Sequence, residues 1–529
     1  MKNIATGNPS FENLITNDYI YVDKTDMLYN LVKSQGGYFF CSRPRRFGKT
    51  LAISTLEAIF KGKKDLFKGL KIYGKDYDWK EYPVIHIDLG NVNPLTTDDL
   101  QYQLNSIVFD VAKKYDVSLE PSQYCNINLK KLILALGENE KVVILIDEYD
   151  KILSSNIYNP EVEKMRDVLR GFFEVIKAQY ELIRFAFITG VTKFAKVSIF
   201  SSMNNLNDIS MNEDYATLFG YTDEEIGSYF AEYIEKGLKA TGLSREEYMT
   251  KLAEKYDGYR FSPESNTAVY NPVSIGSFFA DGGKLFNNYW IDTGNMKLLM
   301  DVAKHNDFDI ANDITTPISR DDITTFDILA MSSSDVDPYT YKSLLFQTGY
   351  LTIKAIDEMN PKALILGFPN EEVSEAYSVN LFSAYAGNRA SGRLKASGVR
   401  FAFEKGNTEY AMNELKAIYE SIPYDLSKNA DELYYSSIFF SSMKALGAEI
   451  GSEIETKNGR VDAILKTEKH IYVFEFKRDQ SADIALRQIH DKGYANQFDV
   501  DRKTKTVHLV GINFSSKEKN ISEYKEEIL

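Results

Sequence analysis

The sequence has 529 residues, and at about 100–200 residues per domain this length predicts roughly three or four domains. Its 62 Lys and Arg residues against 76 Asp and Glu residues give a formal net charge of −14, which argues against nucleic-acid binding over the whole surface but not against a local basic groove. The two cysteines are too few for a disulfide scaffold or a multi-cysteine zinc site. Because the sequence shows neither a signal region nor an apolar run long enough to span a bilayer, we expect a cytoplasmic protein with no membrane partner.

Residues 1–212 alternate between short apolar runs and stretches with helical spacing. The apolar runs lie at 38–41, 84–89, 142–146 and 183–190. Continuous apolar strands that are separated by helices are typical of a parallel sheet covered on both faces. We therefore predict one α/β domain over residues 1–212.

The pattern of apolar and charged residues differs in the segments that follow residue 212. Residues 213–370 contain helical segments with acidic first turns and terminal glycines, then a helix that runs into a hairpin at 343–355. This pattern predicts a helical lid plus a small winged-helix-like module, and residues 371–430 then indicate a helical connector. Residues 431–529 predict a second, restriction-endonuclease-like α/β domain, with a helix at 431–446, a strand at about 448–456, a hairpin at 459–478, a helix at 481–495 and a strand at 505–513.

The first chemical motif is RPRRFGKT at 43–50, which follows a predicted strand and opens a predicted helix. A phosphate-binding loop needs inward-facing backbone N–H groups, a lysine for the β- and γ-phosphates and a hydroxyl for Mg²⁺. Gly48, Lys49 and Thr50 supply the second half of that pattern, and the helix N-terminus adds partial positive charge. Arg43 replaces the first glycine of the pattern, which leaves the geometry of the loop open.

A second motif supports a nucleotide site. The apolar run at 142–146 ends in Asp147 and Glu148. A carboxylate at the end of a buried strand suits Mg²⁺, and the adjacent Glu148 is placed to polarise an attacking water. We therefore predict that ATP and Mg²⁺ bind here, with Thr50 and Asp147 on the metal and Glu148 in hydrolysis. The alternative is that Lys49 and Asp147 are ordinary surface charges.

Further residues are candidates for nucleotide contact. Arg43, Arg45, Arg46 and Phe47 lie within the loop itself, where the arginines are placed to contact phosphate. Thr189 and Thr192 lie at the end of the 183–190 run, where they are placed to sense the γ-phosphate. For the arginines the alternative is a solvated basic turn, and for the threonines it is a polar cap at a strand end.

Residues 459–478 carry a second constellation, in which Asp462 is followed by Glu475 and Lys477. Side chains alternate along a strand, so Glu475 and Lys477 share a face with Ile471 and Val473. A hairpin through the polar turn at 467–470 would bring Asp462 beside Glu475. Two carboxylates suit Mg²⁺, and a lysine beside them can orient water or stabilise the phosphate, which is the layout needed for phosphodiester hydrolysis.

Three other residues are candidates for this second site. Gln488 and Lys492 lie one helical turn apart on one face of the following helix. Glu432, in the preceding helix, is a further candidate metal ligand. The alternative is a chance pattern, in which Glu475 and Lys477 form an ordinary salt bridge on a strand face.

Together these motifs resemble a bacterial and archaeal family of AAA-ATPase-like proteins fused to a PD-(D/E)XK nuclease domain. The matching segments span nearly the whole chain: YVDKT (21–25), SRPRRFGKT (42–50), ILIDEYDK (144–151), FITGVTKF (187–194), YDGYRFS (256–262), VYNPVSI (269–275), NNYWIDTG (287–294), LFQTGYLT (345–352), NGRVDAIL (458–465), VFEFK (473–477) and QIHDKGYA (488–495). Arginine at the first loop position is also typical of that family. The resemblance implies nucleotide, Mg²⁺ and hydrolysis roles for Lys49, Thr50, Asp147 and Glu148, and nuclease chemistry for Asp462, Glu475 and Lys477.

Two functions of different classes follow. The first is an ATP-controlled, Mg²⁺-dependent nuclease, with DNA favoured over RNA as the partner. The second is a nucleotide-sensing switch or scaffold whose nuclease fold binds nucleic acid or a partner without cutting. Residues 451–529 carry 14 Lys and Arg residues and 14 Asp and Glu residues, so any DNA groove must be local. A homo-oligomer is compatible with the sequence, and Arg166, Arg170 and Arg260 are unranked candidates for an arginine finger.

Overall fold

The computed structural model describes residues 1–34, 37–193, 205–290, 317–324, 338–377, 399, 401–420, 439, 443, 449–456 and 459–529. The chain divides into two compact units, one formed by Met1–Trp290 with Pro317–Asn370 and the other by Ile291–Thr316 with Glu371–Leu529. Within the described residues, every helix is too short or too polar to cross a membrane.

A five-stranded parallel sheet forms the amino-terminal part of the first unit. Two of its strands, β3 and β4, are buried along their whole length, as expected for central strands of a sheet covered on both faces. This arrangement confirms the predicted α/β class. The strands lie in the spatial order β2–β3–β4–β1–β5: β1 (Gly37–Ser42), β2 (Val84–Asp88), β3 (Val142–Asp147), β4 (Ile183–Gly190) and β5 (Asn207–Asp208).

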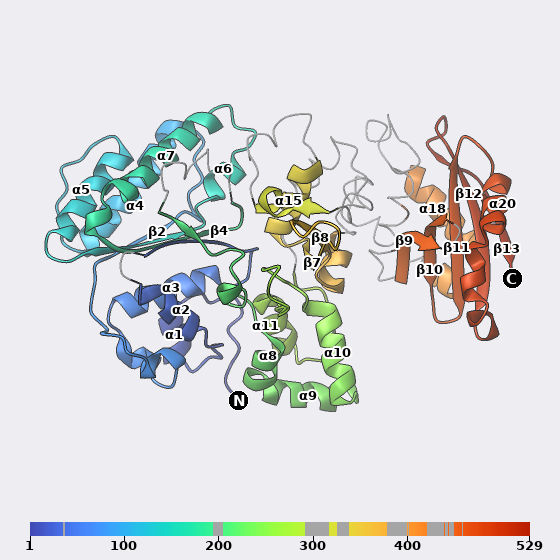
Figure 1. Cartoon of the computed structure of the whole chain (residues 1–529), viewed down its shortest axis with the longest axis horizontal. Coiled ribbons are helices and arrows are strands. Elements are labelled where there is room, and N and C mark those ends of the chain that lie inside the picture. The colour runs from blue at the N-terminus through green and yellow to red at the C-terminus, as the bar shows by residue number, and fades with distance from the viewer. Residues whose placement is uncertain are drawn as a thin grey trace. The chain divides into compact units, whose positions relative to one another are not determined.

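Helices cover both faces of this sheet (Figure 1). On one side lie α1 (Phe11–Thr16), α2 (Thr25–Val32) and α3 (Lys49–Phe60), and on the other lie α4 (Thr97–Lys114), α5 (Cys125–Gly137), α6 (Lys151–Ser155) and α7 (Val162–Ala178). Helix α3 begins directly after the loop that follows β1, so the phosphate-loop motif occupies a strand–loop–helix junction, as predicted.

Four helices continue the first unit, and their starts follow from local side-chain caps. Thr222 and Ser244 form capping boxes with Glu225 and Glu247, which explains the acidic first turns in the sequence. Asn271 caps the last of the four helices, which opens with a proline. The helices are α8 (Asp223–Tyr229), α9 (Ala231–Thr241), α10 (Arg245–Tyr256) and α11 (Pro272–Ala280).

A small antiparallel sheet completes the first unit. Its strands lie in the order β6–β8–β7, and the helix running into a hairpin that the sequence predicts at 343–355 is the end of α15 followed by β7. The elements are β6 (Ile318–Ser319), α14 (Arg320–Thr324), α15 (Pro338–Thr348), β7 (Thr352–Ile356) and β8 (Ala363–Gly367).

The second unit contains a mixed five-stranded sheet in the order β13–β12–β11–β10–β9. Strands β11 and β12 are parallel, and the other neighbouring pairs are antiparallel. The predicted hairpin is found as β10 and β11, whereas the edge strand β13 was not predicted. The elements are α18 (Thr408–Glu420), β9 (Glu449–Thr456), β10 (Gly459–Lys466), β11 (His470–Arg478), α20 (Ala482–Lys492), β12 (Thr506–Ser515) and β13 (Asn520–Ile528).

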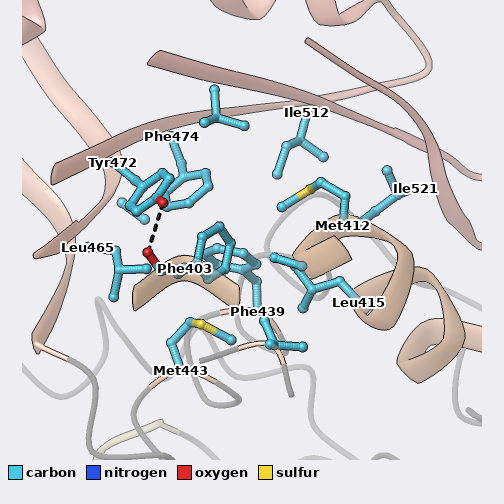
Figure 2. Packing of buried hydrophobic residues seen from close by; sticks show 14 of the residues in the cluster. Phe403, Met412, Leu415, Phe439, Met443, Leu465, Tyr472, Phe474, Ile512 and Ile521 are labelled. Carbon is cyan, nitrogen blue, oxygen red and sulfur yellow. Dashed lines mark hydrogen bonds between the residues drawn. The ribbon is translucent and has the colours of Figure 1, made fainter. Parts of the chain in front are cut away.

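Each face of this sheet carries its own core. Figure 2 shows the core on the α18 side, where Phe403, Met412 and Leu415 pack against Tyr472 and Phe474 of β11. The core on the α20 side contains alternate residues of the same strand, together with residues of α20 and the turn after it: Ile464, Ile471, Val473, Ile489, Tyr494 and Phe498. The predicted alternation along β11 is therefore confirmed. The predicted helix at 431–446 lies outside the described residues, apart from Phe439 and Met443.

Helix α20 lies very close to β12. A Cβ atom on Gly511 of β12 would sit 2.4 Å from the carbonyl oxygen of Ala482 and 2.9 Å from the backbone nitrogen of Leu486. Only glycine fits there without a shift of the helix. This contact fixes α20 over the sheet face that carries Glu475 and Lys477.

Candidate functional site

The loop between β1 and α3 turns at two residues. Gly48, the N-cap of α3, has a φ of 91°, and Arg46 has a φ of 68°. Both values lie in the left-handed region, which glycine adopts at little cost. Arg43 is not among the residues with positive φ, so the loop makes its turn without the missing first glycine.

Lys49 reaches back across this loop. It is buried, and its ammonium donates hydrogen bonds to the backbone carbonyls of Arg43 at 3.0 Å and Pro44 at 2.9 Å. Burial lowers the pKa of Lys49, whereas the charges of Asp147 and Glu148 oppose that shift. The ammonium therefore lies inside the loop and within reach of the acidic end of β3.

Two carboxylates and one hydroxyl meet beside this lysine. The side chain of Thr50, the second residue of α3, lies close enough to Asp147 at the end of β3 to act on the pKa of its carboxylate. Burial raises the pKa of Asp147, while Thr50 and Lys49 oppose the shift, and burial likewise raises the pKa of Glu148 against the charge of Lys49. The structure thus brings Lys49, Thr50, Asp147 and Glu148 together at the carboxyl ends of β1 and β3, where ligands of parallel α/β sheets bind.

The other loop residues divide between this cluster and the packing around it. The charge of Arg45 acts on both Lys49 and Glu148, so Arg45 faces the cluster. The guanidinium of Arg46 instead donates to the backbone carbonyl of Tyr289 at 3.3 Å.

Phe47 and Arg43 anchor the loop to segments far along the chain. Phe47 is buried edge-on against the rings of Tyr259 and Phe261, with ring centroids 4.7 and 5.2 Å apart. Arg43 is buried as well, and its guanidinium donates to the carbonyl of Ser210 at 2.6 Å and lies 4.4 Å from the ring centroid of Phe261. These contacts give both side chains a role in holding the loop.

The two predicted sensor threonines are engaged with the protein. Thr189 is fully buried, and its hydroxyl donates to the carbonyl of Cys41 on the neighbouring strand at 2.8 Å. The hydroxyl and the backbone nitrogen of Thr192 both donate to Asp150, at 2.7 and 2.8 Å. Asp150 was not predicted, and it ties the loop after β4 to the end of β3.

Asp88 and Gly90 also border the nucleotide cluster, and sequence reasoning missed both. Asp88 lies opposite Asp147 in the β2–β3 register. A Cβ atom on Gly90 would lie 2.9 Å from Glu148 Oε2 and 3.0 Å from Asp88 Oδ1. The signal in the sequence resembles that for Asp147, because Asp88 lies near the end of the apolar run at 84–89.

The arginine-finger candidates make contacts within the chain. Arg260 donates to the carbonyls of Pro263 at 2.7 Å and Ser262 at 3.3 Å, so its guanidinium stabilises the loop that follows it. Arg166 and Arg170 lie on α7 within 3.7 and 3.2 Å of the Asp167 carboxylate.

The second predicted site lies on the hairpin of β10 and β11. Ala463 pairs with Phe474 and Ile464 with Val473, and one more step along this register places Asp462 opposite Glu475. Asp462 Oδ2 accepts a hydrogen bond from the backbone nitrogen of Phe476 at 2.6 Å. The two carboxylates therefore converge on one face, as the sequence predicts from the hairpin.

Lys477 lies beside this pair. Its ammonium donates to Glu475 Oε1 at 2.7 Å and to the carbonyl of Phe476 at 2.8 Å, and Glu475 is only 1% exposed. The two carboxylates are oxygen donors that fit Mg²⁺, which prefers oxygen ligands and keeps several waters, whereas the ammonium of Lys477 lies beside them and is not a ligand. Within the described residues there is no cluster of three or more His, Cys, Asp or Glu suited to a metal, so further ligands would come from water or substrate.

The helix α20 contributes the remaining residues. Gln488 is half-buried on this helix, which packs over the sheet face that carries Glu475 and Lys477. The aliphatic part of Lys492 lies near Gly459, where a Cβ atom would be 3.9 Å from Lys492 Cδ. Glu432 lies outside the described residues.

Comparison with known proteins finds one family at each end of the chain, and each match includes one of the two sites. The family model described as predicted AAA-ATPase matches residues 5–200, and the PD-(D/E)XK nuclease superfamily model matches residues 430–524. The chain is also 33% identical over 518 residues to the "Uncharacterized protein in vnfD 5'region" of Azotobacter chroococcum mcd 1, with 95% of this chain and 94% of that protein covered. The chain therefore belongs to the family of AAA-ATPase-like proteins with a carboxyl-terminal PD-(D/E)XK nuclease superfamily domain, as the sequence motifs predict.

Proposed function

We propose that this protein binds and hydrolyses ATP and couples that cycle to metal-dependent cleavage of phosphodiester bonds in nucleic acid, DNA rather than RNA. The observation that carries the proposal is the convergence of Asp462, Glu475 and Lys477 on one face of a hairpin. A structural salt bridge involves only two of these side chains, whereas in metal-dependent hydrolysis the two carboxylates would hold the metal and the lysine would face the phosphate.

In the nucleotide site, each residue has a distinct task. Lys49 faces the β- and γ-phosphates, and Thr50 with Asp147 would hold Mg²⁺. Glu148 accepts a proton from the attacking water or orients it. Burial raises the pKa of Glu148, which moves this carboxylate toward the range in which a general base works best near neutral pH.

In the nuclease site, Asp462 and Glu475 would hold Mg²⁺, which supplies a Lewis acid for phosphodiester hydrolysis when it is bound. Lys477 is placed to stabilise negative charge on the phosphate once substrate draws it away from Glu475. Gln488 lies on α20 beside the same face and contacts the substrate.

The wider assignments are part of the same proposal. Residues 1–212 form the ATPase domain, 213–370 the lid and winged-helix-like module, 371–430 the connector and 431–529 the nuclease domain. The protein acts in the cytoplasm, and its balanced charge over residues 451–529 restricts the DNA-binding surface to a local groove.

One observation favours the alternative of a non-cutting switch or scaffold. Lys477 is paired with Glu475 at 2.7 Å, the contact expected of an ordinary salt bridge. In that reading the nuclease fold binds nucleic acid or a protein, and ATP controls the binding.

The experiment that separates the two functions uses the purified full chain. Supercoiled DNA, linear DNA and RNA are incubated with Mg²⁺ or Mn²⁺, with and without ATP. Metal-dependent cutting of DNA supports the proposal. Binding of DNA with no cutting under any of these conditions supports the scaffold instead.

A further inference from the structure

The carboxyl-terminal end of α15 contacts the loop that follows β4. Gln347 of this helix is 5% exposed, and its Oε1 accepts a hydrogen bond from the backbone nitrogen of Lys193 at 2.6 Å. The two residues are 154 positions apart in the sequence. This bond therefore ties the small module that contains α14 and α15 to the central sheet of the first unit.

The amide nitrogen of Gln347 is engaged as well. Its Nε2 donates to the carbonyl of Ile323 in α14 at 3.1 Å and to Ser343 Oγ at 3.0 Å. The backbone nitrogen of Lys193 can only donate and the carbonyl of Ile323 can only accept, so the orientation of the amide is fixed. Gln347 thus joins an acceptor on α14 to a donor on the loop after β4, which a hydrocarbon side chain cannot do.

The loop after β4 is held from its other side by the two residues that follow Glu148. Asp150 accepts hydrogen bonds from the backbone nitrogen and the hydroxyl of Thr192, at 2.8 and 2.7 Å, and the hydroxyl of Tyr149 donates to the carbonyl of Thr192 at 2.8 Å. Glu148 itself has a φ of 51°. A residue other than glycine keeps such a φ only where its surroundings hold it. A displacement of Lys193 would therefore be passed through Thr192 to the backbone of Glu148.

The same turn of the chain also contacts the phosphate-binding loop. Gly349 directly follows α15 and has a φ of 89°, and a Cβ atom on it would lie 2.7 Å from Pro44 Cβ. The carbonyl of Pro44 accepts a hydrogen bond from the ammonium of Lys49 at 2.9 Å. Gln347 and Gly349 thus contact two different loops that border the nucleotide cluster.

We propose that Gln347 is a positioning residue for ATP hydrolysis, and that it holds the loop after β4, and with it Glu148, in the arrangement that activates the attacking water. This inference rests on the proposed function, because it assigns Gln347 a role in hydrolysis at Glu148. Gln347 acts through the backbone of Lys193 and so affects turnover. Gly349 leaves room for the phosphate-binding loop and so affects nucleotide binding.

Thr348, which lies between these two residues, provides a matched control. It is 1% exposed, and its hydroxyl donates within its own helix to the carbonyl of Leu344 at 2.6 Å. Thr348→Val removes this buried hydrogen bond and keeps the bond between Gln347 and Lys193. The comparison therefore separates the contact with the loop after β4 from a general loosening of α15.

The test compares full-length Gln347→Met, Gly349→Ala and Thr348→Val with the wild type, by ATP turnover and by titration with labelled ATP. Methionine has a similar length to glutamine but no amide, so Gln347→Met should lower kcat about two- to tenfold, the range of one hydrogen bond, with ATP affinity unchanged. Gly349→Ala should instead weaken ATP affinity severalfold, because the added methyl group displaces Pro44. Thr348→Val should match the wild type in both measurements.

Hydrogen exchange adds a readout that needs no turnover. The amides of Thr192 and Lys193 should exchange faster in Gln347→Met than in Thr348→Val, because only the first change removes the acceptor of Lys193. Unchanged kcat in Gln347→Met, or equal losses of kcat in Gln347→Met and Thr348→Val, would overturn the inference.

A wild type that hydrolyses no ATP would reject the proposed function separately, and hydrogen exchange then decides on Gln347. Faster exchange at Tyr149 as well as at Lys193 in Gln347→Met, but not in Thr348→Val, would support a positioning role for Gln347 toward the segment after Glu148. Equal exchange in both variants would reject that role.

Discussion

The two sites hold their lysines in opposite ways. In the nucleotide site, Lys49 donates to two backbone carbonyls of its own loop, and the carboxylates of Asp147 and Glu148 lie beside it. In the carboxyl-terminal site, Lys477 donates directly to the carboxylate of Glu475. The first site is shaped by backbone and the second by side chains on a strand pair.

This difference shows what each site depends on. A backbone-built loop depends on its anchors, here Arg43 and Phe47, which contact residues far along the chain. A strand-built site depends on register, because a slip of one residue would turn Asp462 or Glu475 to the opposite face. Changes that affect one site should therefore leave the other intact, and the following predictions test that separation.

The largest expected effect is on the strand-built site. Glu475→Ala removes one of the two carboxylates that would hold Mg²⁺, so we expect metal-dependent cleavage to fall by at least about a thousandfold. ATP turnover measured without nucleic acid should not change. Glu468→Ala, an exposed residue in the turn of the same hairpin, is the matched control. Cleavage that persists in Glu475→Ala would reject this site.

In the nucleotide site, Glu148→Gln keeps the shape and polarity of the side chain but removes the base. Hydrolysis should fall by about a hundredfold or more, while ATP affinity is kept. Asp147→Ala should instead weaken Mg²⁺-dependent binding itself. Turnover and labelled-ATP titration on the same preparations measure both. Equal turnover in wild type and Glu148→Gln would make Glu148 a structural residue.

Arg43→Gly restores the glycine of the common phosphate-loop pattern, yet we expect this change to destabilise the folded protein. The change removes a buried guanidinium that donates to Ser210 and lies over Phe261, at a cost of about 3 kcal/mol in stability. Thermal unfolding should show a lower midpoint, and ATP affinity should not improve. A variant that is as stable as wild type would show that Arg43 does not anchor the loop.

The smallest effect in this series concerns Lys49→Ala. One charge-assisted contact to phosphate is lost, so ATP affinity should weaken by about ten- to a hundredfold. Lys113→Ala, on the exposed face of α4, is the control. DNA cleavage in the absence of ATP should be equal in both variants and in wild type. Unchanged ATP affinity in Lys49→Ala would remove the basis of the phosphate-loop assignment.

Sequence patterns predicted those parts of both sites that are formed by residues close together in the sequence. The strand–loop–helix around Gly48 and the alternation along 471–477 follow from apolar runs and side-chain periodicity, and the structure contains both. The edge strand β13 escaped prediction because its outward residues are mostly charged and only Ile521 is fully buried in it. Charged edge strands protect a sheet from further pairing but resemble loops in sequence.

The parts that were missed depend on distant contacts. Arg43 looked like a phosphate ligand, and nothing near it in the sequence indicates its hydrogen bond to Ser210, 167 residues away. Phe47 was likewise a candidate for nucleotide contact, and nothing near it in the sequence indicates that its ring packs against Tyr259 and Phe261.

The proposed function places two separate metal sites in one chain, and it requires nucleotide for metal binding only at the amino-terminal site. Anomalous diffraction from crystals grown with Mn²⁺, with and without a non-hydrolysable ATP analogue, tests this most directly. We predict a Mn²⁺ peak at Asp462 and Glu475 in both crystals, and a second peak beside Thr50 and Asp147 only when the analogue is present. Crystals with no Mn²⁺ at Asp462 and Glu475, and with Lys477 still paired to Glu475, would contradict the claim.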